Sequence, residues 1–197
     1  MPRVAIGVRM HSGWGVLVAV TQSAAIIERR RIDVISKETN AAHLGSQPYH
    51  RAAELGVAKA EKYLAQYTAE SERLACDAIA TLMVEMKRGG YQITVAALLL
   101  ASQRQLPPLP KILASHPLIH TAEGELFRET IRRACESLGI PVLRLRERDL
   151  SDRAKEALGP SFSTVLRKIE IAGKFLGPPW TADHKAAALG ASIALRG

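Results

Sequence analysis

The stretch that decides the fold is IGVRMHSGWGVLVAV, which runs from Ile6 to Val20 near the start of the chain. Apolar side chains occupy every second position before and after the dipeptide Ser12-Gly13. Such alternation on both sides of a glycine turn predicts a β-hairpin. A third strand is expected over residues 24–35, with charged side chains at 28–31 in its middle. The chain is therefore predicted to open with a three-stranded antiparallel meander.

The remainder of the sequence alternates between helical and strand patterns. A helix placed between two short, apolar strands predicts a parallel pair of strands, because the chain must cross over to start the second one. The expected elements are, in order, a loop (37–48), one long helix or a helical pair (about 49–90), a buried strand (93–101), a proline-rich loop (102–110), a helix (118–138), a short strand (141–145) and three helices (151–158, 162–176 and 184–195).

Length and composition favour one globular domain that spans residues 1–197, with the segment 49–90 as a helical insertion or long helix. Two cysteines support neither a disulfide scaffold nor a zinc–cysteine cluster, and they favour a cytoplasmic protein. No run of apolar residues is long enough to span a bilayer, so no membrane partner is expected. The formal charge of +8 favours nucleic acid as a partner, and a homodimer is compatible with the sequence.

The order of elements resembles the ribonuclease H-like fold, and both ends of the chain resemble its Holliday-junction resolvase (RuvC) branch. In that branch the opening reads approximately IGIDPG…TGYGV and the last helix begins approximately DHxxDALA. The matching letters here are Ile6-Gly7-Val8, residues 12–16, Asp183-His184 and Ala187. The resemblance implies an α/β domain whose five-stranded mixed sheet joins a three-strand antiparallel meander to two parallel strands, with helices on both faces.

The resemblance also implies a site, and the sequence departs from it. In the family, carboxylates on the first strand, the fourth strand and the last helix gather two divalent metal ions that act on a phosphodiester. Here Arg9 stands at the first-strand position, residues 101–103 hold no acid, and Ala186 replaces an acid of the last helix. Asp183 alone remains. A guanidinium stays cationic, so Arg9 is expected to repel a metal and to pair with Asp183 if the fold brings them together.

Two hypotheses about function follow. The first is a non-catalytic protein that binds nucleic acid or acts as a scaffold and needs no cofactor. Its candidate binding residues form one group: Arg9, His11, Ser12, Lys185, Arg144 and Arg146. The second is an enzyme, either a Mg²⁺- or Mn²⁺-dependent nuclease with relocated acids (Glu54, Glu123 and Asp183) or a histidine-based hydrolase (His116, His120 and His184).

The opening hairpin is also similar to that of actin-like ATPases, in which it holds phosphate. Those proteins need two such domains and a far longer chain, so this relation ranks below the first. The sequence contains no nucleophile elbow, P-loop, paired-cysteine motif or dinucleotide fingerprint.

Histidines and acids gather in the segment ASHPLIHTAEGELFRE. His116 and His120 are four residues apart, a spacing that can ligate zinc if both are helical, with Glu123 as a third ligand or a base. The alternative interpretation is an ordinary helix start, with acids near its positive end and later glutamates paired with arginines. No metal can be named from these letters alone.

The segment GPPWTADHK, residues 177–185, permits a second pair of interpretations. Asp183 and His184 either face the same site as Arg9 and His116, or they belong to an ordinary helix start. In the latter case Thr181 or Asp183 is the N-cap and Trp180 a packing residue. The arginine-rich segments 28–31 and 144–149, with the arginines of the helix 118–138, either bind phosphate or are solvated edges.

Overall fold

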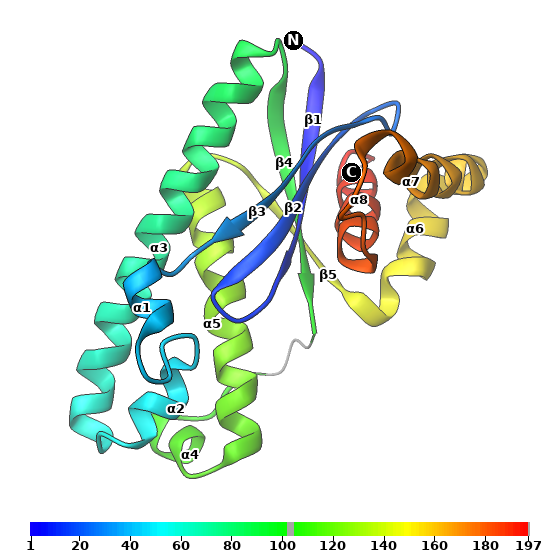
Figure 1. Ribbon diagram of the computed structural model, residues 1–197. Helices are drawn as coiled ribbons and strands as arrows, with labels where there is room; N and C mark the ends of the chain where they lie inside the picture. The colour runs from blue at the N-terminus through cyan, green and yellow to red at the C-terminus, as the bar shows by residue number, and fades with distance from the viewer. Residues whose placement is uncertain (102–104, 197) are drawn as a thin grey trace.

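The computed structural model describes residues 1–101 and 105–196, and a five-stranded sheet runs through its centre (Figure 1). The sheet has the order β3-β2-β1-β4-β5. β1, β2 and β3 pair in antiparallel fashion, whereas β4 is parallel to β1 and β5 is parallel to β4. The strands are β1 (Arg3–Met10), β2 (Trp14–Thr21), β3 (Ile26–Asp33), β4 (Gln92–Leu100) and β5 (Val142–Arg146). The predicted ribonuclease H-like arrangement of a meander and two parallel strands is confirmed.

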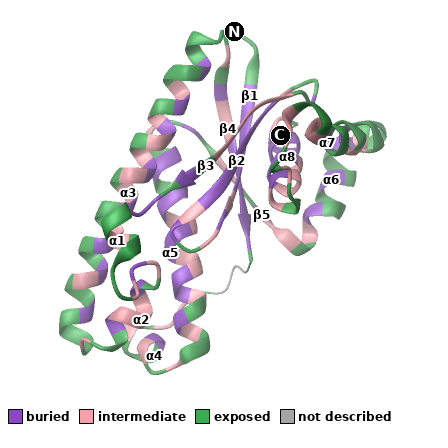
Figure 2. Ribbon diagram, in the orientation of Figure 1, coloured by how far each residue is buried: buried purple, intermediate pink, exposed green. Residues whose placement is uncertain are grey.

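Helices cover both faces of this sheet (Figure 1). One apolar core joins α3 and α5 to one face, and a second joins α6, α7 and α8 to the other. Figure 2 shows the consequence, since β1, β2 and β4 are buried for most of their length. The helices are α1 (Lys37–Ala41), α2 (Pro48–Ala53), α3 (Val57–Arg88), α4 (Leu109–Leu113), α5 (His116–Ser137), α6 (Leu150–Leu158), α7 (Phe162–Leu176) and α8 (Ala182–Ala194), with the 3₁₀ turns η1 (Glu147–Asp149) and η2 (Gly159–Ser161).

The expected loops are where the structure differs from the sequence prediction. Residues 37–41 form α1, because the hydroxyl of Ser36 accepts a hydrogen bond from the backbone N–H of Thr39 and caps the helix. The proline-rich segment ends in α4, whose first turn contains Pro110, a position where a missing N–H has no cost. The part of the predicted loop at 102–104 lies outside the described residues.

The segment 49–90 resolves into a short helix, α2, and one 32-residue helix, α3, which ends at Arg88 with Gly89 as its C-cap. None of the helices in the described part of the chain combines the length and apolar character needed to cross a bilayer.

Helix α8 lies directly on β1, and this close packing positions the residues discussed below. A Cβ added to Gly7 would lie 1.8 Å from the carbonyl oxygen of Ala187. The glycine on the strand and the alanines on the helix therefore let the two backbones touch, as the small residues of 184–195 predict. Because side chains alternate along a strand, Arg9 projects from the same face of β1 as Gly7. Asp183 lies one turn before Ala187 on α8, which brings it close to Arg9.

Candidate functional site

Arg9 lies between two carboxylates that come from different elements. One nitrogen of its guanidinium, Nη1, donates to Asp183 Oδ1 on α8, so the expected ion pair is present. Nε and Nη2 donate to Glu147 Oε1 and Oε2 at 3.1 and 3.0 Å, which is a bidentate contact. The hydrogen bond with Glu147 is the largest cause of a raised pKa for Arg9. The guanidinium is therefore a permanent cation that joins two acids.

His11 extends this group of side chains toward the hairpin. Its Nε2 lies 2.8 Å from Asp183 Oδ2, and its ring stacks on Trp14 with 4.4 Å between centroids. Arg31 covers Trp14 as well, with its guanidinium carbon 4.1 Å from the ring centroid. Because His11 and Arg31 both pack on the indole, it is not a free stacking platform for bases. We refer to Arg9, His11, Glu147 and Asp183 as the Arg9 network.

Sequence reasoning missed Glu147, which lies within the arginine-rich segment 144–149. The residue begins η1, immediately after the carboxyl end of β5. Carboxyl ends of parallel strands are where open α/β sheets place functional side chains. That position was the signal that could have identified Glu147.

His184 is a capping residue of α8 and not a member of the Arg9 network. Its Nδ1 accepts a hydrogen bond from the backbone N–H of Thr181 at 3.2 Å, while the Thr181 hydroxyl caps the backbone of residue 184. Its ring is buried and lies beside Trp180, whose indole N–H donates to the carbonyl of Ile169. Burial is the main cause of a lowered pKa for His184, followed by the charge of Arg29. The interpretation of Thr181 as N-cap is confirmed.

The other predicted histidines belong to a helix that packs on the opposite face of the sheet from α8. His116 and His120 both belong to the first turns of α5, which packs with α3, whereas His184 belongs to α8. The structure therefore does not bring the three histidines of the proposed hydrolase together. It brings in His50 of α2 instead, which the sequence reasoning did not consider. We refer to His50, His116 and His120 as the histidine cluster.

The histidine cluster has a buried carboxylate behind it. One ring nitrogen of each histidine lies within 4.8 Å of those of the other two. Glu123 Oε1 lies 2.9 Å from Nδ1 of His50 and also accepts from the backbone N–H of that residue at 3.2 Å. The Glu123 side chain is only 5% exposed, and its Oε2 is 3.9 Å from Nδ1 of His120. The predicted proximity of His116, His120 and Glu123 is therefore found, with His50 added.

The acids of the relocated-nuclease hypothesis do not form one group. Glu54 ends α2, where it is exposed and pairs with Arg51 and His43. Glu123 contacts the histidine cluster, and Asp183 contacts Arg9. The structure therefore gives each of these three acids a different set of partners and does not gather them around one point.

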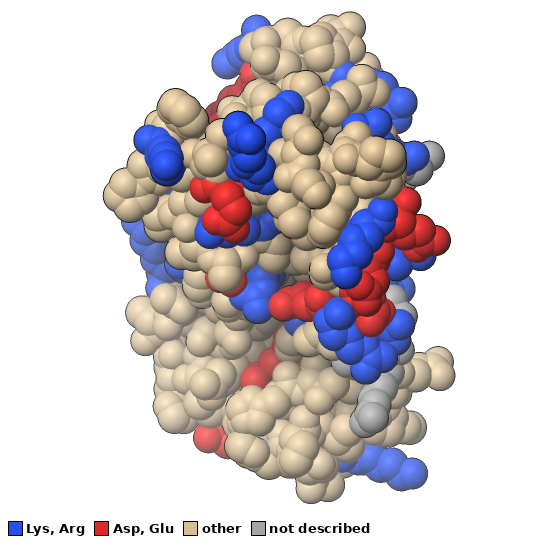
Figure 3. Space-filling model, turned by 90° about the vertical axis from the view of Figure 1, so that its right-hand side faces the viewer, with Lys and Arg blue, Asp and Glu red and all other residues tan. Residues whose placement is uncertain are grey.

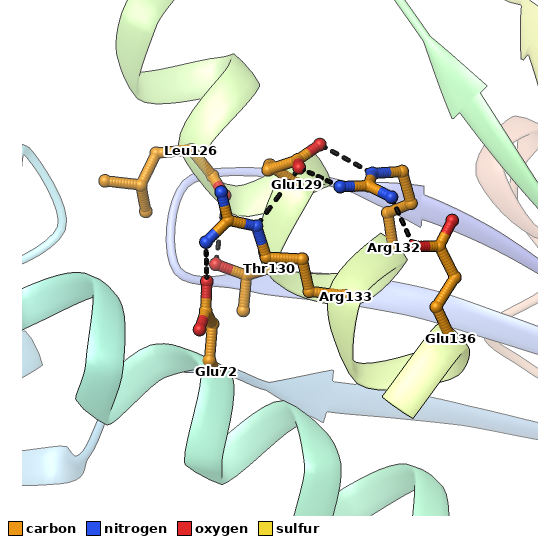
Figure 4. A network of polar contacts seen from close by, with 7 residues as sticks. All are labelled: Glu72, Leu126, Glu129, Thr130, Arg132, Arg133 and Glu136. Carbon is orange, nitrogen blue, oxygen red and sulfur yellow. Dashed lines mark hydrogen bonds and ion pairs between the residues drawn. The ribbon is translucent and has the colours of Figure 1, made fainter. Parts of the chain in front are cut away.

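The basic residues of the helix 118–138 are largely neutralised by acids. Figure 4 shows Arg132 and Arg133 of α5, each bound to Glu129, with Glu136 and Glu72 as further partners. The hydrogen bond from Arg132 is the largest cause that lowers the pKa of Glu129 to about 2. Arg133 thus joins α5 to Glu72 of α3, whereas both acidic partners of Arg132 lie on α5 itself.

The remaining binding candidates are dispersed. Lys185 pairs with Glu170 at 2.6 Å, and Arg146 with Asp149 at 2.5 Å. Arg144 is exposed on β5, and Ser12 is exposed at the turn between β1 and β2. On the face that carries α6 and α7, basic side chains lie in separate groups with acidic ones among them (Figure 3). Positive charge is thus spread over this face and does not form one continuous patch.

Comparisons with known proteins find a likeness of structure only. The sequence matches no protein-family model, and no curated protein sequence matches it either. The chain aligns with two solved structures, T. thermophilus RuvC in complex with Holliday junction substrate and Thermus thermophilus RuvC. Each alignment has a TM-score of 0.49 at 10% identity and covers 98% of this chain and 93% of the RuvC chain. The fold assignment rests on the strand order and directions given above. The chain resembles these resolvases in fold, and its activity is a separate question.

Proposed function

We propose that this chain is a ribonuclease H-like domain that binds nucleic acid without cleaving it. The observation that carries the proposal is the contact of Arg9 with both Glu147 and Asp183. Two-metal phosphodiester cleavage needs carboxylate oxygens that are free to hold cations. Here the oxygens point at a cation that belongs to the chain itself.

The energetics of the Arg9 network support this interpretation. A metal ion that entered between Glu147 and Asp183 would have to displace a guanidinium that makes three hydrogen bonds. It would also have to approach a fixed positive charge, which repels it. Arg9 is only 27% exposed, so solvent screens this repulsion incompletely.

The nucleic-acid part of the proposal rests on the formal charge of +8, which remains after every ion pair has been counted as neutral. Because the basic groups are dispersed in Figure 3, we expect contacts to phosphates at several separate points without base-specific recognition. Such binding must weaken as salt increases, since each contact releases counterions.

Two assays test the proposal. The protein is incubated with labelled duplex and branched DNA in Mg²⁺ or Mn²⁺, and we expect no cleavage above that of a no-protein control. Binding to the same duplex is followed by fluorescence anisotropy, and we expect affinity to fall about tenfold between 50 and 200 mM salt if two phosphates are contacted.

Each assay can contradict one part. Mn²⁺-dependent cleavage that disappears in Asp183→Ala would overturn the non-catalytic assignment. Affinity for DNA that does not change with salt, or no binding at the lowest salt, would overturn the assignment of nucleic acid as partner.

A further inference from the structure

The histidine cluster is assembled from α2 and the start of α5, which meet beside α4 at one end of the molecule (Figure 1). His116 and His120 are four residues apart and therefore share one face of α5. The third imidazole arrives from α2, and its ring lies 5.2 and 4.8 Å from the other two rings, centroid to centroid. We infer that His50, His116 and His120 bind one first-row divalent cation, with Zn²⁺ as the ion that this ligand set fits best.

The spacing of the nitrogens suits such an ion. Zinc binds imidazole nitrogen at about 2.0–2.1 Å in tetrahedral sites, which places ligand nitrogens roughly 3.4 Å apart. The three nitrogens here are within 4.8 Å of one another. His116 and His120 are exposed, so small rotations of their side chains can close the difference. Their exposure also leaves a fourth position open to water or a substrate, as in catalytic zinc sites.

The contact between Glu123 and His50 orients the third ligand. An ionised Glu123 can only accept, so Nδ1 of His50 donates to it and Nε2 keeps the lone pair that a metal requires. This arrangement of carboxylate, histidine and metal is a recurrent way to fix a ligating ring and raise its basicity. Glu123 also holds the backbone N–H of His50, which fixes the start of α2 relative to α5.

Charge gives a second reason for a cation at this point. Glu123 is almost fully buried, and an isolated carboxylate is costly to bury. A divalent ion beyond His50 would compensate this charge through the imidazole. In the alternative arrangement His50 is itself protonated as the partner of Glu123, and the three rings then bind no metal.

Metal titration separates these two arrangements. Tag-free protein is dialysed against EDTA and then against chelator-free buffer near neutral pH. Zn²⁺ is titrated by calorimetry and Co²⁺ by visible absorbance, which reports tetrahedral nitrogen ligation. We expect one equivalent of either metal per chain. Glu123→Gln should weaken the affinity about 10–100-fold, the usual effect of losing the carboxylate behind a ligand.

The variants His116→Ala and His120→Ala carry the decisive comparison, because both side chains are exposed and their loss should leave the fold intact. Each should weaken Zn²⁺ binding about 100-fold or more, since a lost ligand costs at least as much as a lost supporting carboxylate. His43→Ala is the matched control, an exposed histidine of the same region that pairs with Glu54 outside the cluster. Absence of one-equivalent binding in the wild type would overturn the inference. Binding that persists in His116→Ala and His120→Ala, or falls equally in His43→Ala, would overturn it too.

Discussion

The Arg9 network lies where α8 packs on β1, whereas the histidine cluster lies where α2 meets the start of α5. Each gathers side chains that suit a cation. In the first, two carboxylates converge on a guanidinium that is part of the chain. In the second, three imidazoles converge on one another, and the nearest carboxylate is already engaged with one of them. The Arg9 network therefore already holds an internal cation between its carboxylates, whereas the imidazoles of the histidine cluster still have ligand atoms to offer.

The largest expected effect is a loss of stability where α8 packs on β1, in the region of the Arg9 network. Gly7→Ala should destabilise the protein by about 3 kcal/mol, because the new Cβ would overlap the backbone of α8 and push it away from β1. Urea denaturation followed by circular dichroism measures the loss. If the two regions are independent, the folded variant should still bind Zn²⁺ with wild-type affinity.

Gly124→Ala is the control for this change, because it makes the same substitution on α5 beside the histidine cluster. Only the flexible end of Arg128 lies in the way of that Cβ, and alanine favours a helix over glycine by about 1 kcal/mol. We expect a stability within about 1 kcal/mol of the wild type. A Gly7→Ala protein as stable as Gly124→Ala would show that α8 does not rest on β1 as described.

Elements with a clear period could be predicted from the sequence, and contacts between distant elements could not. The hairpin and β4 follow from alternating or continuous apolar residues, and a single turn such as α1 has too few residues to show a period. The pairing of Arg9 with Asp183 could be expected because the resemblance placed both residues in one family site. Glu147 and His50 had no such guide, since they meet their partners across 138 and 73 residues.

The second prediction removes the internal cation. Arg9→Met keeps the apolar stem and leaves Glu147 and Asp183 facing each other without compensation. Because the group is partly buried, we expect a loss of about 2 kcal/mol, between the values typical of exposed and of buried pairs. Arg73→Met, which breaks only an exposed pair with Asp77, should change stability by less than about 0.5 kcal/mol.

Arg9→Met should also change how the protein responds to metal ions. Once the guanidinium is gone, the two carboxylates resemble the oxygen ligands that hard cations prefer. We therefore expect Mn²⁺ to stabilise Arg9→Met more than the wild type in thermal unfolding. Adding Glu147→Gln to Arg9→Met should recover part of the lost stability and remove this Mn²⁺ effect. Equal Mn²⁺ effects on wild type and Arg9→Met would show that Arg9 is not what keeps metal away.

The smallest expected effect concerns two histidines whose Nδ1 atoms have opposite roles. Nδ1 of His50 donates to Glu123, whereas Nδ1 of His184 accepts from Thr181 and must be unprotonated to do so. Since the folded pKa of His184 lies below its ordinary value of 6.5, the unfolded chain binds a proton there first as pH falls. The stability contributed by this cap is thus complete above pH 6.5 and decreases as pH is lowered from 6.5 toward the folded pKa.

His184→Gln preserves an acceptor at the same helix position but does not titrate. Its unfolding free energy should fall less steeply than that of the wild type on acidification, by about 1 kcal/mol at most, the usual value of a cap. Parallel pH dependences for the two proteins would show that the ring is not held as an acceptor. The steeper dependence of the wild type would instead assign His184 to the framework that positions Asp183.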